Sequence, residues 1–145
     1  MFIEGNTILA VIFGLALILN FACSTPQVQI VDCTVQEVIQ INEVIMFDWD
    51  DYCIRADQMD LLNRIAETMI ANPDLVLVLE GYASEEGDID YNLELSQDRA
   101  DAVKSMLMLS NVPEENIKKA IGNGESTIFG DLLDDNRRVM VLSIN

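Results

Sequence analysis

One basic residue, Arg99, stands out among the acidic and apolar residues of the segment 92–107. The chain has 145 residues, with 8 Lys and Arg against 25 Asp and Glu, so positive charge is rare. A guanidinium group presents a planar fork of N–H donors, which suits a carboxylate better than the ammonium of lysine does. An amphipathic helix explains the apolar residues of this segment but not Arg99, which is therefore a candidate functional residue. The alternative is that it pairs with Asp98 or Asp101 on an exposed helix, a contact that contributes little.

The overall composition excludes several classes of function. A formal net charge of −17 leaves nothing to neutralise a run of phosphates, so we expect no nucleic-acid partner. The same charge disfavours electrostatic docking on an anionic lipid surface. The chain has no histidine, which removes the usual general base and the commonest transition-metal ligand. We expect no metal and no cofactor.

Carboxylates are dense in the segments 48–51 and 80–90, where they could supply the acid pair of a glycosidase. Because this density follows from the composition alone, we do not expect an enzyme. The segment 88–92 also has the spacing of the first ligands of an EF-hand calcium loop. That loop needs Gly at its sixth position and Glu at its twelfth. Leu93 and Arg99 stand there, so we predict no calcium site.

The first 22 residues have the character of a targeting segment. Ile8 to Leu19 is an unbroken apolar run of about a dozen residues, the length of a signal-peptide core and short of the ~20 that span a bilayer. Ala22 and Cys23 follow, and they resemble a lipobox, in which the Cys is acylated after cleavage. Asn20 and the lack of Lys or Arg before the run depart from that pattern. The alternative is an uncleaved membrane anchor lengthened by the apolar residues beside the run.

We therefore expect residues 1–22 to be a lipoprotein-type signal peptide and 23–35 to be a short linker behind a lipidated Cys23. The serine after it resembles the residue that permits sorting to the outer membrane. Cys33 and Cys53 remain, an even number in an oxidising compartment, so a disulfide between them is one expectation. The other is two separate buried thiols, because a sequence does not report the Cα separation that a bridge requires.

Residues 36–145 are expected to form one α+β domain. In chain order the patterns predict a strand at 44–47, a helix capped by Asp57 and ended by 72–73, a strand at 75–79, a loop at 81–87, a helix at 91–109, a strand at 117–121, a turn at 122–124 and a strand at 139–144. The run 75–79 is apolar throughout, which favours a strand covered on both faces or nearly so. The order β-α-β-α-β-β, with the helices on one side, makes a two-layer sandwich.

Five segments, in order, resemble motifs of the OmpA-like peptidoglycan-binding domain. They are V-x-F-D-x-D at 44–50, E-G-H-A-D-x-x-G at 80–87, N-x-x-L-S-x-x-R-A-x-x-V-x-x-x-L at 92–107, G-x-G-E-S at 122–126 and N-R-R-V at 136–139. The helix signature matches without a gap, and the resemblance covers the chain from about residue 36 to its end. With a lipobox-like segment in front, the overall plan is similar to that of the peptidoglycan-associated lipoproteins.

The resemblance implies a domain that binds the diaminopimelate residue of the peptidoglycan stem peptide without cleaving it. It gives Arg99 the role of pairing with a diaminopimelate carboxylate. The family's loop Asp, which contacts the ligand's ammonium, is Ser84 here, and a hydroxyl carries no charge. Glu85 or Glu86 could compensate from the next positions. Asp50 matches a third family position near the pocket.

Four other conspicuous side chains are expected to stabilise the fold rather than to bind a ligand. Arg137 and Arg138, in the closing motif, are expected to pair with carboxylates. Trp49 and Tyr52, in the loop after the first strand, are expected to pack against the core. Gly81 and Gly87 are expected to serve the turn requirements of their loop.

Together these features predict a non-catalytic envelope tether, lipid-anchored in the outer membrane, with its domain facing the periplasm. Its partners would be peptidoglycan and, through the lipid, the membrane. Whether a Tol-type envelope protein also binds is left open by the sequence. The alternative is a membrane-anchored OmpA-like protein of a stator or another envelope complex. A stator subunit of the MotB kind needs an acidic residue inside its spanning helix, and Ile8–Leu19 has none.

Overall fold

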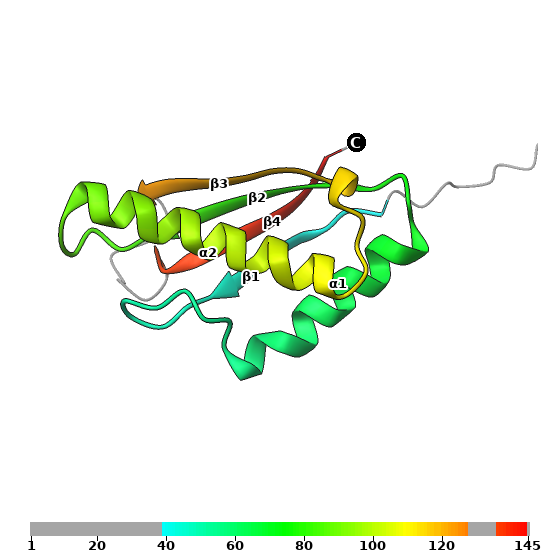
Figure 1. Ribbon diagram of the computed structural model, residues 1–145, viewed down its shortest axis with the longest axis horizontal. Coiled ribbons are helices and arrows are strands. Elements are labelled where there is room, and N and C mark those ends of the chain that lie inside the picture. The colour runs from blue at the N-terminus through cyan, green and yellow to red at the C-terminus, as the bar shows by residue number, and fades with distance from the viewer. Residues whose placement is uncertain (1–38, 128–135, 145) are drawn as a thin grey trace, which may run out of the picture. The chain divides into compact units, whose positions relative to one another are not determined.

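The computed structural model describes residues 39–127 and 136–144, which belong to one unit, Glu37–Asn145 (Figure 1). The predicted signal peptide and linker lie outside the described residues, and so do Cys23 and Cys33. In the part of the chain that is described, no helix is long and apolar enough to cross a membrane.

Strands and helices alternate as predicted. Their order is β1 (Asn42–Met46), the short 3-10 helix η1 (Ala56–Gln58), α1 (Met59–Ala71), β2 (Val76–Ala83), α2 (Ile89–Leu109), the 3-10 helix η2 (Glu114–Asn116), β3 (Ile117–Glu125) and β4 (Arg138–Ile144). The sheet has the order β1-β4-β2-β3, with β4 antiparallel to β1 and β2 and with β2 parallel to β3. Both helices cover one face of the sheet (Figure 1), which confirms the two-layer α+β fold.

An apolar core fills the space between the helices and the sheet. Its members come from all four strands, both helices and the segments between them, and they include Ile45, Leu62, Ile65, Met69, Leu77, Leu79, Val103, Leu107, Ile117, Val139 and Val141. Along β2, buried and half-buried residues alternate, since Leu77 and Leu79 face the helices while Val76 and Val78 face the other way. Because the two helices share one face (Figure 1), β2 is covered by helices on that face only, and its other face is half-buried, which is less cover than expected for the second face.

Two strands are longer than predicted. β2 continues through Gly81 to Ala83, and β3 continues through the predicted turn at 122–124 to Glu125, because the two strands stay paired to their ends. Gly81 serves a close approach and not a turn. A Cβ atom there would lie 2.0 Å from the carbonyl oxygen of Ser96, so any larger residue would push α2 away from the sheet.

The two helices begin differently from each other. Asp57 does not cap α1, whose N-cap residue is Gln58 and has no capping side-chain bond; Asp57 instead pairs with Arg55 at 2.9 Å. α2 begins before the predicted residue 91, because Asp88 caps it by accepting hydrogen bonds from the backbone N–H groups of residues 90 and 91. Asp88, the first acid of the EF-hand-like spacing, therefore serves as a helix cap. The described residues contain no cluster of potential metal ligands.

Candidate functional site

The buried side of α2 brings the sequence signature against the sheet. Its seven buried residues are Asn92, Leu95, Ser96, Arg99, Ala100, Val103 and Leu107, the positions singled out from the sequence. The hydroxyl of Ser96 donates to the carbonyl oxygen of Leu93 at 2.7 Å and accepts from the N–H of Gly124 at 2.8 Å. This small polar side chain lets α2 lie close to β3 while satisfying a strand N–H.

Arg99 is buried at the centre of this region, with 1% of its surface exposed. Its guanidinium donates three hydrogen bonds to backbone carbonyl oxygens, from Nε to Asp51 at 2.9 Å, from Nη1 to Tyr82 at 3.0 Å and from Nη2 to Asp48 at 3.0 Å. It also lies 5.4 Å from the centre of the Phe47 ring. Arg99 therefore joins α2 to the end of β2 and to the loop after β1. The alternative of an exposed helix ion pair is wrong.

Among the described residues, no carboxylate forms an ion pair with Arg99. Burial, and after it the charge of Arg137, lower the pKa of Arg99 to about 10, against the opposing effect of the Asp51 and Asp50 charges. The side chain therefore stays positive at neutral pH. A buried cation with neutral carbonyl partners favours an anion beside it. A guanidinium group has five N–H bonds that can donate. Three of them donate to carbonyl groups of described residues, which leaves two for a ligand.

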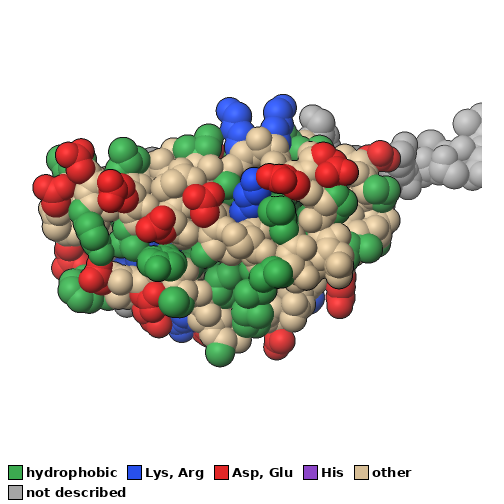
Figure 2. Space-filling view, in the orientation of Figure 1, with side chains coloured by type: hydrophobic (Ala, Val, Ile, Leu, Met, Phe, Trp, Pro, Cys, Tyr) green, Lys and Arg blue, Asp and Glu red, His purple; other side chains and the backbone are tan. Residues whose placement is uncertain are grey.

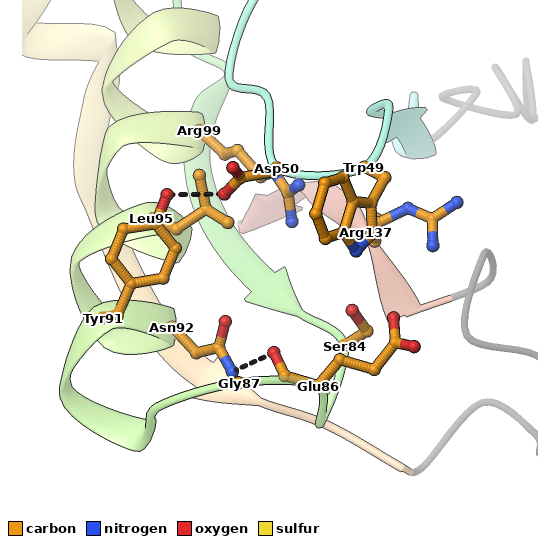
Figure 3. Close-up of a pocket in the computed structure, with 10 residues that line it drawn as sticks. All are labelled: Trp49, Asp50, Ser84, Glu86, Gly87, Tyr91, Asn92, Leu95, Arg99 and Arg137. Carbon is orange, nitrogen blue, oxygen red and sulfur yellow. Dashed lines mark hydrogen bonds between the residues drawn. The ribbon is translucent and has the colours of Figure 1, made fainter.

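A pocket of about 180 Å³ opens next to Arg99 (Figure 3). It is lined by residues of the loop after β1, of the loop before α2, of α2 and of the segment just before β4, namely Trp49, Asp50, Ser84, Glu86, Gly87, Tyr91, Asn92, Leu95, Arg99 and Arg137. All three site residues predicted from the sequence, Arg99, Ser84 and Asp50, therefore line one cavity. The lining also contains two arginines and two carboxylates, a mixture suited to a ligand that carries both signs of charge.

The position of Asp50 depends on its backbone conformation and on one side-chain hydrogen bond. Its backbone has a φ of 52°, a left-handed conformation that Asp tolerates better than most residues. Its carboxylate accepts a hydrogen bond from the hydroxyl of Tyr91 (Figure 3). That bond raises the pKa of Tyr91, so the hydroxyl stays protonated and keeps donating. The loop after β1 is thereby tied to the first turn of α2 across the mouth of the pocket.

The opposite wall is the segment 84–87. Ser84 is buried, and Glu86 lines the pocket whereas Glu85 does not. Asn92 donates from Nδ2 to the backbone carbonyl of Glu86 at 3.0 Å and to a carboxylate oxygen of Glu125 at 2.9 Å. Gly87, which follows Glu86, has a φ of 109°. This conformation strongly favours glycine, so the expected turn requirement at Gly87 is confirmed. Asn92 and Gly87 together fix the backbone of this wall.

The exposed surface of α2 and of the loop before it is strongly acidic. Exposed carboxylates gather over the start and the outer side of α2 (Figure 2), and they include Glu85, Asp88, Asp90, Glu94, Asp98 and Asp101. A simple anion would be repelled by this field, whereas a ligand that also carries a positive group would be tolerated.

The sequence reasoning missed three lining residues. Trp49 is 66% exposed at the rim, so its expected packing role is wrong, as is that of Tyr52, which is 52% exposed. Arg137 lines the pocket near Arg99 instead of serving the fold alone. For Tyr91, which also lines the pocket, the sequence pattern predicts only the start of a helix. The one available signal was proximity, since Trp49 adjoins the candidate Asp50 in the chain.

Cys53 is an exposed thiol. Its backbone N–H donates to Asp51 at 2.7 Å, and the nearby carboxylate raises the pKa of the thiol. The alternative of a buried thiol is therefore wrong for Cys53. Its predicted disulfide partner, Cys33, lies outside the described residues, so the bridge stays a prediction.

Comparisons with known proteins agree with this fold. Residues 46–138 match the model of the OmpA family. Peptidoglycan-associated lipoproteins of Agrobacterium fabrum and Pasteurella multocida are each 35% identical to the chain, over 55% and 54% of its length and 45% and 53% of theirs. The chain therefore spans about half the length of these curated relatives.

Two solved structures share the architecture. The peptidoglycan-associated lipoprotein of Burkholderia pseudomallei superposes with a TM-score of 0.65 at 27% identity, covering 70% of this chain and 89% of that one. The C-terminal domain of Helicobacter pylori MotB superposes with a TM-score of 0.64 at 20% identity, covering 71% of this chain and 84% of that one, a likeness of fold alone. The family match covers more than half of the chain, which therefore belongs to the OmpA family.

Proposed function

We propose that this chain is a non-catalytic envelope tether, an outer-membrane lipoprotein anchored through Cys23 whose domain binds the peptidoglycan stem peptide at its diaminopimelate residue. The observation that carries the proposal is the buried, charged guanidinium of Arg99 at the wall of a pocket, with two N–H groups left by its described bonds. The names of the relatives, peptidoglycan-associated lipoproteins, support the class of ligand.

Each lining group has a role in this proposal. Arg99 donates its two remaining N–H groups to a carboxylate of diaminopimelate, and Arg137 adds positive charge beside it. Ser84 offers a buried hydroxyl to the ligand from the opposite wall. Asp50, held by Tyr91, contributes negative charge next to Arg99 and keeps the loop closed on that side.

Binding to isolated cell-wall sacculi tests the proposal. The detergent-extracted full chain should sediment with sacculi, and free diaminopimelate should compete. Arg99→Lys keeps the charge and loses the fork, so sedimentation should fall about tenfold or more. Because Arg99 also joins three segments, the variant must first show the far-ultraviolet circular dichroism and the melting cooperativity of a folded domain. A folded Arg99→Lys that binds like the parent would remove Arg99 from the site, and no binding by the parent would refute the function.

The tether is proposed to bind without cleaving. Incubation of the chain with sacculi should release no soluble muropeptides, and their release would contradict a non-catalytic role.

The anchor has its own test. The mass of the membrane-extracted protein should correspond to a chain that begins at an acylated Cys23, whereas an intact N-terminus would favour the membrane-anchored alternative. The stator version of that alternative rests only on the shared fold with MotB. Cross-linking in intact cells would show whether a Tol-type protein is the envelope partner.

A further inference from the structure

The wall formed by residues 84–87 carries its charge at a different position from the one implied by the family resemblance. Ser84, which stands where the family has an acid, is buried and neutral. Glu86, two residues later, also lines the pocket, whereas Glu85 does not. In Figure 3 the side chains of Ser84 and Glu86 stand at one edge of the pocket, and those of Asp50 and Arg99 at the other. A negative group is therefore present on this wall, supplied by Glu86.

The backbone of Glu86 is positioned before any ligand arrives. Its carbonyl accepts a hydrogen bond from Asn92, which is 3% exposed and whose same amide nitrogen also bonds to Glu125. Gly87 then turns the chain with its positive φ, and Asp88 caps α2. With the backbone fixed, only the side chain of Glu86, which is exposed, remains to be ordered when a ligand binds, and this favours a role in recognition.

The other lining carboxylate already has partners. Asp50 accepts a hydrogen bond from the hydroxyl of Tyr91, and its charge partly offsets the lowering of the pKa of Arg99. Arg99 and Arg137 place positive charge in the same cavity. Glu86 is therefore the lining carboxylate best placed to receive an incoming cation, while the arginines receive an anion.

We propose that Glu86 binds the ammonium group of the ligand's zwitterionic end, the role that the family resemblance assigns to the residue at 84. This inference rests on the proposed function and sharpens it. The pocket would select stem peptides whose third residue ends in both an ammonium and a carboxylate. A lysine-type stem peptide, which ends in an ammonium alone, would use only the Glu86 wall and would bind more weakly.

The test measures the affinity of the full chain for a synthetic stem peptide ending in meso-diaminopimelate. The chain has a single tryptophan, and Trp49 lies at the pocket rim, so its fluorescence reports binding directly. Glu86→Gln should weaken binding about tenfold, because a charge-assisted bond is lost. Glu85→Gln is the matched control, since it removes the same charge from an adjacent exposed residue, and it should change the affinity less than about twofold.

A second arm isolates the contact itself. Acetylating the ammonium of the side-chain end of the peptide should weaken binding to the parent about as much as Glu86→Gln does. The two changes should not add, because they remove the same pair. Ser84→Asp placed in the Glu86→Gln chain should restore much of the affinity for the unmodified peptide.

The outcomes separate the two proposals. Equal effects of Glu86→Gln and Glu85→Gln, or additive effects of Glu86→Gln and acetylation, would overturn the role of Glu86 and leave the proposed function standing. A parent chain that binds neither peptide nor sacculi would refute the proposed function, and the role of Glu86 with it.

Discussion

The two helices lie on the same sheet but are buried in different ways. α1 buries four apolar residues, Leu62, Ile65, Ala66 and Met69. α2 buries seven residues, and three of them, Asn92, Ser96 and Arg99, are polar and lie in its first half. Buried polar groups are costly unless they are hydrogen-bonded, and each of these three is. α1 therefore contributes by apolar burial alone, whereas the first half of α2 gives up apolar area to build the wall of a pocket.

The second half of α2 resembles α1. Val103 and Leu107 are fully buried in the same apolar core as the residues of α1. Polar burial is thus confined to the part of α2 that packs against the loops after β1 and β2 and against the end of β3. One helix therefore combines apolar packing in its second half with buried polar contacts beside the pocket in its first half.

The largest expected difference between the helices comes from their arginines. Arg99→Met should lower the free energy of unfolding by about 3 kcal/mol or more, because the carbonyls of Asp48, Asp51 and Tyr82 lose their shared donor. Arg64→Met on the exposed side of α1 should change it by less than about 0.5 kcal/mol. Urea unfolding of both variants provides the measurement. Similar stabilities would mean that polar burial in α2 contributes nothing beyond that of a surface residue.

The next effect concerns how closely α2 approaches the sheet. Gly81→Ala should destabilise the fold by about 2–3 kcal/mol, because the new Cβ would lie 2.0 Å from the carbonyl oxygen of Ser96. Gly87→Ala is the control. Its Cβ would meet nothing closer than 3.9 Å, so only the backbone strain at its positive φ, about 1 kcal/mol, should be felt. If thermal unfolding showed the two variants to be equally stable, steric contact would not be what holds α2 in place.

Helix capping gives a smaller difference. Asp88→Ala should cost about 1 kcal/mol, because its carboxylate accepts two N–H groups at the start of α2. Gln58→Ala at the N-cap of α1 should cost less than about 0.5 kcal/mol, since Gln58 has no capping bond and only a long 3.3 Å contact with the N–H of Met46. Equal losses in urea unfolding would show that α1 is capped in solution after all.

The same contrast explains what could be predicted from the sequence. The buried face of α1 follows from apolar spacing alone, and the seven buried positions of α2 follow from one ungapped signature. Strand lengths did not follow, because Gly81 and the glycines at 122 and 124 have the composition of turns yet serve strands on which α2 packs closely. Local composition does not reveal such an approach, which depends on the tertiary structure.

The site was predicted in part for a similar reason. Arg99, Ser84 and Asp50 could be chosen from motifs, and the structure brings them to one pocket. The backbone partners of Arg99 could not be predicted from the sequence. Every residue has a carbonyl group, and only the folded structure brings those of residues 48, 51 and 82 to Arg99. Arg137 was missed because it is distant in sequence from the other lining residues.

The smallest expected effect is a pH dependence at the start of α1. A hydrogen bond from Arg55 lowers the pKa of Asp57 below its usual 3.8. The folded state therefore binds this proton less readily than the unfolded state does. The resulting stability is complete above the unfolded pKa and is lost as pH falls through the lowered folded value. The stability gap between the parent and Asp57→Asn, measured by urea unfolding, should thus be constant from pH 7 to about pH 5 and should shrink toward pH 3.

The pKa of Arg99 is also lowered, to about 10, but here the protonated form is the charged one, so burying its charge opposes folding at neutral pH, whereas the Asp57 charge favours it. That cost is relieved only as pH rises through 10, where the folded state gives up the proton first.

A gap between the parent and Asp57→Asn that stayed constant down to pH 3 would show that the Arg55–Asp57 pair is equally formed in the unfolded chain. In that case α1 would depend on its apolar face alone, and the contrast with the charged first half of α2 would be sharper still.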